Sequence, residues 1–216
     1  MDVDTQELPI FPLNTVLFPG ETIPLQIFED RYKLMINECI EKNTRFGVAL
    51  IREGKEVGGP AIPYEIGTIA RLADHKNIPD GRIHITCIGQ EKFEIIEIIS
   101  ESPFLRALVR TGKNLEIDDV KDETLELSHL SMAKHFNNLL SMKGSWVSSP
   151  YVPSDPIQFS YFISQILQLK VSERQKLLEM DSCEMRLNTS RQYLEDQSEK
   201  TAVRSKIEIL LKFCRQ

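Results

Sequence analysis

The sequence lacks the cysteine spacing of a disulfide framework or a zinc finger. Its four cysteines, Cys39, Cys87, Cys183 and Cys214, lie far apart, and no Cys-x-x-Cys occurs. Disulfide scaffolds and structural zinc sites depend on closely spaced, paired cysteines. The pattern therefore argues against both classes and fits a reducing compartment, so we expect a cytoplasmic protein.

A surplus of basic residues and a long apolar run are also missing. The chain of 216 residues has 26 Lys and Arg against 32 Asp and Glu. Residues 1–112 alone carry a net charge of −5, which disfavours nucleic acid as a partner because phosphate contacts need Lys and Arg. No uncharged run approaches the roughly 20 apolar residues of a membrane helix, and the acidic start is unlike a secretory signal. We therefore expect no membrane partner.

Motifs for nucleotide, metal or nucleophilic chemistry are absent as well. Gly54-Lys55 and Gly112-Lys113 lack the first glycine of a phosphate-binding loop, since Ala49 and Ala107 occupy that position. No two of the four histidines have metal-ligand spacing, and no Gly-x-Ser-x-Gly occurs. The sequence thus predicts no catalytic residue, no metal and no cofactor.

What the sequence does contain changes character near residue 112. Before that point, alternating patterns predict strands over residues 45–51, 66–73, 82–88, 91–100 and 104–111, with one helix over residues 29–42. Gly89 is expected to supply a positive φ for a hairpin or bulge between two of these strands. A β half followed by an α half predicts an α+β fold, divided into residues 1–112 and 113–216.

The pattern of the second half predicts helices. Helical spacing of apolar residues covers residues 119–142, and Asp155-Pro156 predicts the N-cap and first turn of another helix. Ser172 and Gln175 have the spacing of a capping box. A long last helix is expected over residues 182–214. Its polar middle, residues 195–200, offers little apolar surface to bury, so we expect this part to project into solvent or bend.

The N-terminal segment is the most distinctive part of the chain. It reads Leu-Pro-x-Phe-Pro-Leu from Leu8, Val-Leu-Phe-Pro-Gly from Val16, and Pro-Leu-x-Ile-Phe-Glu-x-Arg-Tyr from Pro24. Its prolines remove sheet donors, so it must run along edges or between layers. These motifs resemble the N-terminal substrate-binding (LON) domain of ATP-dependent Lon proteases. The resemblance continues through Gly89-Gln90-Glu91-Lys92-Phe93 and residues 174–179 to about residue 190.

The resemblance implies a PUA-like β pseudo-barrel with one inserted helix, followed by a helical bundle that ends in a long helix. It also implies binding of unfolded or exposed apolar polypeptide segments, with a separate protease or chaperone as a further partner. Full Lon proteases continue into an ATPase and a Ser–Lys peptidase domain, whose motifs this sequence lacks. We therefore expect a free-standing, non-enzymatic recognition module that takes part in proteolysis.

Five apolar residues of the motifs are the candidate peptide-binding residues: Phe18, Ile27, Phe28, Tyr32 and Phe93. The alternative for each is a structural role, in which the five close the barrel and seat the first helix. An alternative function is recognition of a small ligand or RNA by a PUA-like sensor or adaptor, since an apolar pocket also suits a small molecule.

Overall fold

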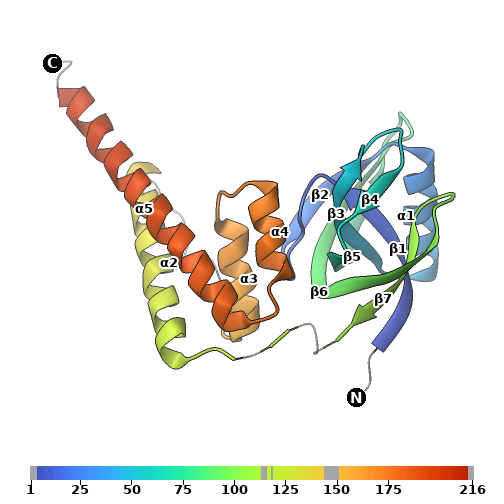
Figure 1. Cartoon of the computed structure of the whole chain (residues 1–216). Coiled ribbons are helices and arrows are strands. Elements are labelled where there is room, and N and C mark those ends of the chain that lie inside the picture. Colours follow the sequence, from blue (N-terminus) through green and yellow to red (C-terminus); the bar gives the residue numbers. More distant parts are fainter. Residues whose placement is uncertain (1–3, 113–115, 118, 144–150, 214–216) are drawn as a thin grey trace. The chain divides into compact units, whose positions relative to one another are not determined.

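Figure 1 shows the computed structural model of the chain, which describes residues 4–112, 116–117, 119–143 and 151–213. The fold is α+β, as predicted. Strands come first, with one helix among them: β1 (Asp4–Leu13), β2 (Thr22–Ile27), α1 (Asp30–Lys42), β3 (Phe46–Gly54), β4 (Ala61–Pro63), β5 (Ile66–Asn77), β6 (Ile83–Ser100) and β7 (Arg106–Thr111). Helices follow: α2 (Asp122–Lys143), α3 (Pro156–Ile166), α4 (Val171–Glu179) and α5 (Cys183–Phe213).

The chain folds into two compact units. The barrel unit is Met1–Ile117 with Leu169–Asp181, and the helical unit is Asp118–Gln168 with Ser182–Gln216. The sequence-based division at residue 112 differs from these units mainly in α4, which belongs to the barrel unit. None of the helices in the described part of the chain is both long and apolar enough to cross a membrane.

The barrel closes through one parallel strand pair. Neighbouring strands follow the order β1-β7-β6-β5-β3, and β3 returns to pair with β1 from Ile10 opposite Gly47 to Leu13 opposite Leu50. β2 adds to β6, and β4 adds to β3. The interior is filled by apolar side chains from the strands, from α1 and from two of the connecting segments; they include Leu17, Ile27, Tyr32, Met35, Ile36, Phe46, Val48, Ile85 and Phe104.

β1 shows how a proline-rich segment is accommodated in a barrel. It borders β7 over residues 4–9 and β3 over residues 10–13, so each half has a strand on one side. Ile10 N donates to Leu105 O at 2.8 Å, which places the amides of even-numbered residues on the β7 side. Pro9 therefore faces away from β7, and Pro12 lies beyond the residues that β7 pairs. The expected edge position of these prolines is confirmed.

The hairpin break and the positive φ predicted at Gly89 are wrong, whereas the alternative prediction of a bulge is confirmed, because the β5–β6 register shifts between Ala70 opposite Gly89 and Thr68 opposite Lys92. β6 runs without interruption through 18 residues, and the φ of Gly89 lies outside the left-handed region. Glycine is needed there for a different reason, because a Cβ at this position would lie 2.2 Å from Phe18 O. Gly89 N donates to Glu21 O, and Gly20 N donates to Gly89 O, so the segment after β1 lies directly against β6.

α4 is fixed to the barrel by polar contacts. Arg174 donates to Val16 O at 3.0 Å and to both carboxylate oxygens of Glu21 at 2.8 Å, and Gln175 donates to Ile66 O at 3.1 Å. The predicted capping box at Ser172 and Gln175 is wrong. The N-cap is Lys170, two residues earlier than predicted, and Glu173 accepts from Lys170 N at 3.0 Å instead.

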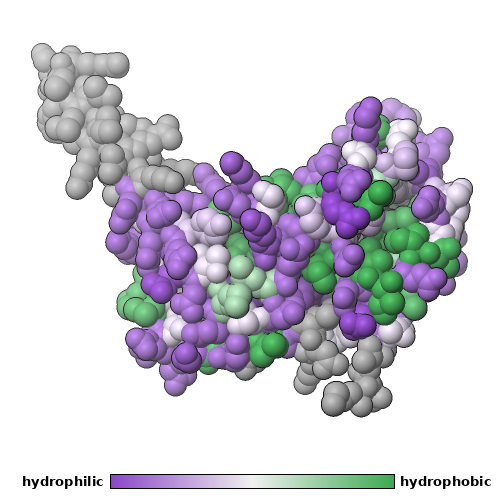
Figure 2. Space-filling model, viewed as in Figure 1, coloured by the Kyte–Doolittle hydropathy of each residue, from purple (hydrophilic) through white to green (hydrophobic). Residues whose placement is uncertain are grey.

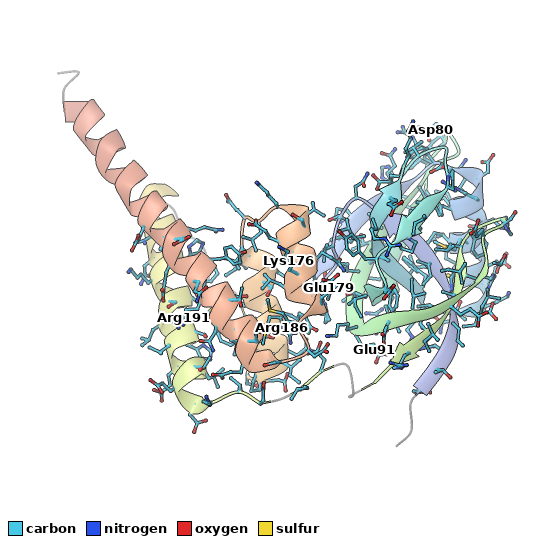
Figure 3. All side chains as sticks on the ribbon, viewed as in Figure 1. Asp80, Glu91, Lys176, Glu179, Arg186 and Arg191 are labelled. Carbon is cyan, nitrogen blue, oxygen red and sulfur yellow. The ribbon has the colours of Figure 1, made fainter. Side chains whose placement is uncertain are left out.

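The helical unit contains α2, α3 and α5. Asp155 caps α3 by accepting from Gln158 N at 2.8 Å, which confirms that prediction. Polar side chains are buried between these helices. Arg186 donates to Ser160 Oγ at 2.8 Å and lies over the Tyr161 ring (Figure 3). The polar middle of α5 does not simply project into solvent, because Ser198 is buried and contacts His135 of α2 at 3.2 Å.

Candidate functional site

An apolar cleft opens on the barrel unit where β1 ends and α1 begins. Its volume is about 280 Å³, near the lower end of the range typical of ligand pockets. The walls come from the end of β1, from β2 and the first turn of α1, and from the loop between β3 and β4. The lining residues are Phe11, Leu13, Pro24, Leu25, Gln26, Ile27, Phe28, Glu29, Tyr32, Glu56 and Val57.

The floor of the cleft is made of buried side chains. Phe11, Leu13, Ile27 and Tyr32 are each at most 5% exposed, and the rings of Phe11 and Tyr32 lie 4.3 Å apart. Burial raises the pKa of the Tyr32 hydroxyl, with the neighbouring Arg31 guanidinium acting in the opposite direction. The floor is therefore buried, largely apolar and uncharged at neutral pH.

The rim carries exposed apolar side chains. Phe28 is 49% exposed and Val57 is 53% exposed. β2 ends at Ile27, and successive side chains of an extended segment point to opposite faces. Ile27 accordingly enters the core while Phe28 faces outward. An aromatic ring held half in water at the mouth of an apolar cleft is available for contact with another molecule.

The loop that supplies Val57 is tied to the barrel on both sides of the cleft. Asn14 Nδ2 donates to Glu56 Oε2 at 2.9 Å, and Gly58 N donates to Glu29 Oε2 at 3.2 Å. Arg31 donates to Gly59 O at 3.2 Å while pairing with Glu29 at 3.0 Å. Residues 56–59 are thus hydrogen-bonded to three residues, Asn14, Glu29 and Arg31, so the loop forms a wall of the cleft.

Three of the five predicted residues meet in this cleft, namely Ile27, Phe28 and Tyr32. Phe18 and Phe93 do not line it. Phe18 is fully buried beneath the Arg174 guanidinium, which lies 4.7 Å from the ring centre. Phe93 is fully buried against Gly47 and Gly67, whose missing side chains leave room for its ring. Both positions fit a structural role.

Val57, Leu25 and Glu56 were missed by sequence reasoning. Leu25 and Glu56 are half-buried, and Val57 is a single apolar residue in a charged loop, so no periodic pattern marks any of them. The one available signal was the alternation of β2, which places Leu25 and Ile27 on one face.

A second, larger hollow of the barrel unit is lined by charged as well as apolar side chains. Its volume is about 710 Å³, and its lining includes Glu7, Glu38, Lys42, Arg45, Arg71, His75 and Arg106. Several of its cations are already paired. Arg106 contacts Glu38 at 2.7 Å and Glu7 at 3.5 Å, and Arg45 contacts Glu91 at 3.0 Å. A phosphate would have to compete with these carboxylates, which does not favour nucleic acid.

The cysteines of the described residues are unsuited to nucleophilic chemistry. Cys39, Cys87 and Cys183 are buried thiols, whereas Cys214 lies outside the described residues. Burial raises the pKa of the Cys39 thiol, and that of the Cys87 thiol to about 12. Within the same part of the chain, no group of three His, Cys, Asp or Glu residues could hold a metal ion.

A family model and the related sequences both connect this chain to Lon proteases. The family model described as the ATP-dependent protease La (LON) substrate-binding domain matches residues 7–196. The Lon protease of Flavobacterium johnsoniae is 28% identical over 215 residues, which cover 95% of this chain and 26% of that protein. The Lon protease of Amoebophilus asiaticus is 29% identical over 198 residues, which cover 89% and 24%. The chain spans about a quarter of the length of the curated relatives that it matches.

Solved structures agree with the sequence relatives. The crystal structure of a Lon N-terminal domain protein from Xanthomonas campestris superposes with a TM-score of 0.66 at 25% identity, covering 85% of this chain and 96% of that one. The N-terminal domain of a Mycobacterium avium complex Lon protease superposes with a TM-score of 0.65 at 16% identity, covering 88% and 99%. The second match shows a shared fold.

Proposed function

Because the chain belongs to the LON substrate-binding domain family, we propose that it binds exposed apolar segments of other polypeptides in the cleft between β1, β2, α1 and the β3–β4 loop. The observation that carries this proposal is the rim of the cleft. Half-exposed Phe28 and Val57 stand over a buried apolar floor on a wall held by Asn14, Glu29 and Arg31.

The size and chemistry of the cleft suit one or two apolar side chains of an extended segment. Complete burial of a phenylalanine or leucine side chain contributes roughly 1.5–3 kcal/mol. A single inserted side chain therefore gives weak, reversible binding with little selectivity for sequence. That is the behaviour required of a module that distinguishes unfolded from folded proteins, since folded proteins bury such side chains.

We infer further that the module binds its clients without transforming them, and that a separate protease or chaperone receives them. The matching region of its relatives is the substrate-binding region, and the buried cysteines supply no reactive thiol. Purified chain should hydrolyse neither ATP nor casein. Turnover that rises in proportion to the concentration of the chain would contradict this inference.

Binding at the cleft can be tested with a fluorescein-labelled peptide of ten residues, in which two phenylalanines are separated by glycine and serine. Fluorescence anisotropy should give saturable binding to the native chain and none when both phenylalanines are replaced by serine. Phe28→Asp should weaken binding about tenfold or more, because about 1.4 kcal/mol corresponds to a factor of ten.

The matched control is Leu34→Asp. Leu34 is 44% exposed on α1 but does not line the cleft, so its replacement should leave the peptide affinity unchanged. Circular dichroism must show that both variants are folded. Equal affinity of Phe28→Asp, Leu34→Asp and the native chain for the peptide would refute the assignment of the cleft.

The alternative function, recognition of a small ligand, has one observation in its favour, which is the 710 Å³ hollow with charged side chains in its lining. Its paired charges suit a polar molecule that carries both donors and acceptors. Thermal stabilisation of the chain by a soluble metabolite mixture, abolished by Arg71→Ala and retained in Phe28→Asp, would favour this second function over peptide binding.

A further inference from the structure

The last part of β6 exposes an apolar surface that the fold does not explain. Ile96, Ile98 and Ile99 are 44%, 39% and 49% exposed. Figure 2 shows a hydrophobic area at the right of the view, where Figure 1 draws the end of β6 and β7. Ile96 and Ile98 lie two positions apart on the strand, and the pairing of β6 with β7 shifts register between Ile95 and Glu97 and between Ile98 and Ser100. Isolated exposed apolar residues need no explanation, but three exposed isoleucines within four positions give this strand edge an apolar surface.

The same residues lie on an open strand edge. β6 pairs with β2 over residues 83–88 and with β5 as far as Glu94, while β7 pairs with it from Glu94 onward. Ile95 N donates to Glu65 O at 2.7 Å, and this is the last contact given on the β5 side. Among the described residues, residues 96–100 thus have a strand on one side alone. An open edge presents backbone donors and acceptors to a further strand.

The unpaired charges around this edge are of one sign. Glu65, Glu97 and Glu101 are exposed, and none of the three has an ion-pair partner within residues 4–112. The two arginines of the paired strand are already engaged by carboxylates: Arg106, opposite Ser100, contacts Glu38 at 2.7 Å, and Arg110, opposite Glu94, contacts Glu94 at 2.7 Å. The strand edge therefore combines isoleucine side chains with carboxylates that a cationic partner would neutralise.

We propose that residues 96–100 of β6 form a second docking surface, where a polypeptide segment with alternating apolar and Lys or Arg residues adds as an extra strand. Strand addition supplies main-chain hydrogen bonds, and alternate side chains of the added strand reach the isoleucines and the carboxylates. This goes beyond the proposed function, because the surface shares no residue with the cleft and its occupancy does not depend on the cleft.

A second copy of the chain is the less suitable occupant. Pairing two identical edges would bring Glu97 and Glu101 of one copy close to the same carboxylates of the other. Like charges placed opposite each other across a strand pair are destabilising. A basic, apolar segment from a different polypeptide meets no such repulsion, and its association is accelerated by the opposite charge.

The proposal can be tested with three fluorescein-labelled peptides of eight residues: alternating valine and lysine, alternating valine and glutamate, and the first peptide N-methylated along one edge. By anisotropy, the native chain should bind the valine–lysine peptide at least tenfold more tightly than either of the others. The preference for lysine should fall when the salt concentration rises.

Variants locate the binding. Ile98→Lys should weaken binding of the valine–lysine peptide at least tenfold, and Glu97→Lys combined with Glu101→Lys should shift the preference towards the valine–glutamate peptide. The matched control is Leu127→Lys on α2, which is 40% exposed against 39% for Ile98 and should change nothing. Phe28→Asp should also leave this binding intact, so failure of the cleft and failure of the edge are distinguishable.

Three results would overturn the proposal. The first is equal binding of the valine–lysine and N-methylated peptides, which would exclude strand addition. The second is an unchanged peptide preference in the doubly charge-reversed variant. The third is a concentration-dependent dimer of the native chain that Ile98→Lys abolishes, because the edge would then be occupied by a second copy.

Discussion

A single phenylalanine shows how closely the barrel interior is packed. The ring of Phe93 fills the space left by Gly47 and Gly67. A Cβ on Gly67 would lie 2.5 Å from both Phe93 Cζ and Val48 O, and a Cβ on Gly47 would lie 2.8 Å from Ile10 Cδ1. Those distances are far inside van der Waals contact, so at these two glycines the missing side chain is a packing requirement.

Gly67→Ala should therefore lower the free energy of unfolding of the chain. Overpacking of a filled core typically costs about 1–3 kcal/mol, and here one of the obstructing atoms is a backbone carbonyl that cannot rotate away. Urea denaturation followed by circular dichroism measures the change. Gly59→Ala is the control, because its Cβ would meet Lys55 Cβ at an ordinary 3.8 Å. Equal stability of the two variants would contradict this packing.

The alternation of side-chain directions along an extended segment determines whether neighbouring residues are buried or exposed. Ile27 and Phe28 are adjacent and both apolar, yet Ile27 is 1% exposed and Phe28 is half exposed. The family motif that contains both residues suggests that both contact a peptide. The direction of each side chain shows instead that Ile27 belongs to the core and Phe28 to the surface. In the proposed site, Ile27 and Tyr32 shape the floor, and Phe28 makes the contact.

At the scale of secondary-structure elements, Arg174 makes several of the polar contacts that join α4 to the rest of the barrel unit. Arg174 joins Val16 O, the Glu21 carboxylate and the ring of Phe18, with its side chain only 14% exposed. Glu21 in turn accepts from Phe18 N at 2.9 Å. This group fixes the proline-rich segment after β1 between β6 and α4.

Arg174→Met should loosen α4 from the barrel unit. It leaves a partly buried carboxylate without its guanidinium, and an unsatisfied charged group of this kind costs about 1–3 kcal/mol or more. Hydrogen exchange should rise in residues 171–179 more than in the strands. Lys176→Met is the control on the exposed side of the same helix (Figure 3). Unchanged exchange in Arg174→Met would show that other contacts hold the helix.

α2 and α5 are joined by polar as well as apolar side chains. His135 is buried beside Ser198, and His129 stacks on Phe159 of α3 with ring centres 3.9 Å apart. Burial lowers the pKa of both imidazoles below the ordinary 6.5, because desolvation disfavours the charged form. Both rings are neutral in the folded helical unit at pH 7.

The helical unit should consequently lose stability in mild acid. The unfolded chain takes up protons near pH 6.5, whereas the folded chain resists them, so this contribution to stability is complete above pH 6.5 and declines as the pH falls below it. Hydrogen exchange of residues 122–138 at pH 7.5 and pH 5, corrected for the intrinsic pH dependence, measures the change. In His135→Gln, the change in hydrogen exchange between pH 7.5 and pH 5 should be smaller than in the native chain. An equal change in the variant and the native chain would contradict the account.

At the scale of the whole molecule, the sequence predicted the order and class of elements better than their connections. The α+β fold, the inserted helix and the aspartate cap of α3 follow from local patterns and from the family motifs. The continuity of β6 through Gly89 does not, because the reason for that glycine is the distant Phe18 carbonyl. The position of α4 likewise depends on Glu21, far from Arg174 in the sequence.

The candidate site was predictable in part for the same reason. Family motifs indicated a stretch of chain that lines the proposed cleft, residues 27–32, because it carries its own pattern. Val57 lines the cleft because its neighbours in the loop are hydrogen-bonded to Asn14, Glu29 and Arg31. These contacts join residues far apart in the sequence, so no local pattern in the charged loop predicts them. The sequence predicts a strand over residues 91–100, which covers the exposed end of β6. It does not predict that this end forms an open edge, because that depends on where the neighbouring β5 stops pairing.

Photo-crosslinking tests the central claim, that the cleft beside Phe28 receives apolar polypeptide segments, most directly. A benzophenone side chain replaces one phenylalanine of the ten-residue probe, and mass spectrometry locates the crosslinked residues on the native chain. We predict crosslinks within residues 24–32 and 55–59, suppressed by an excess of the unmodified peptide. Competed crosslinks that fall only in other parts of the chain would contradict the account.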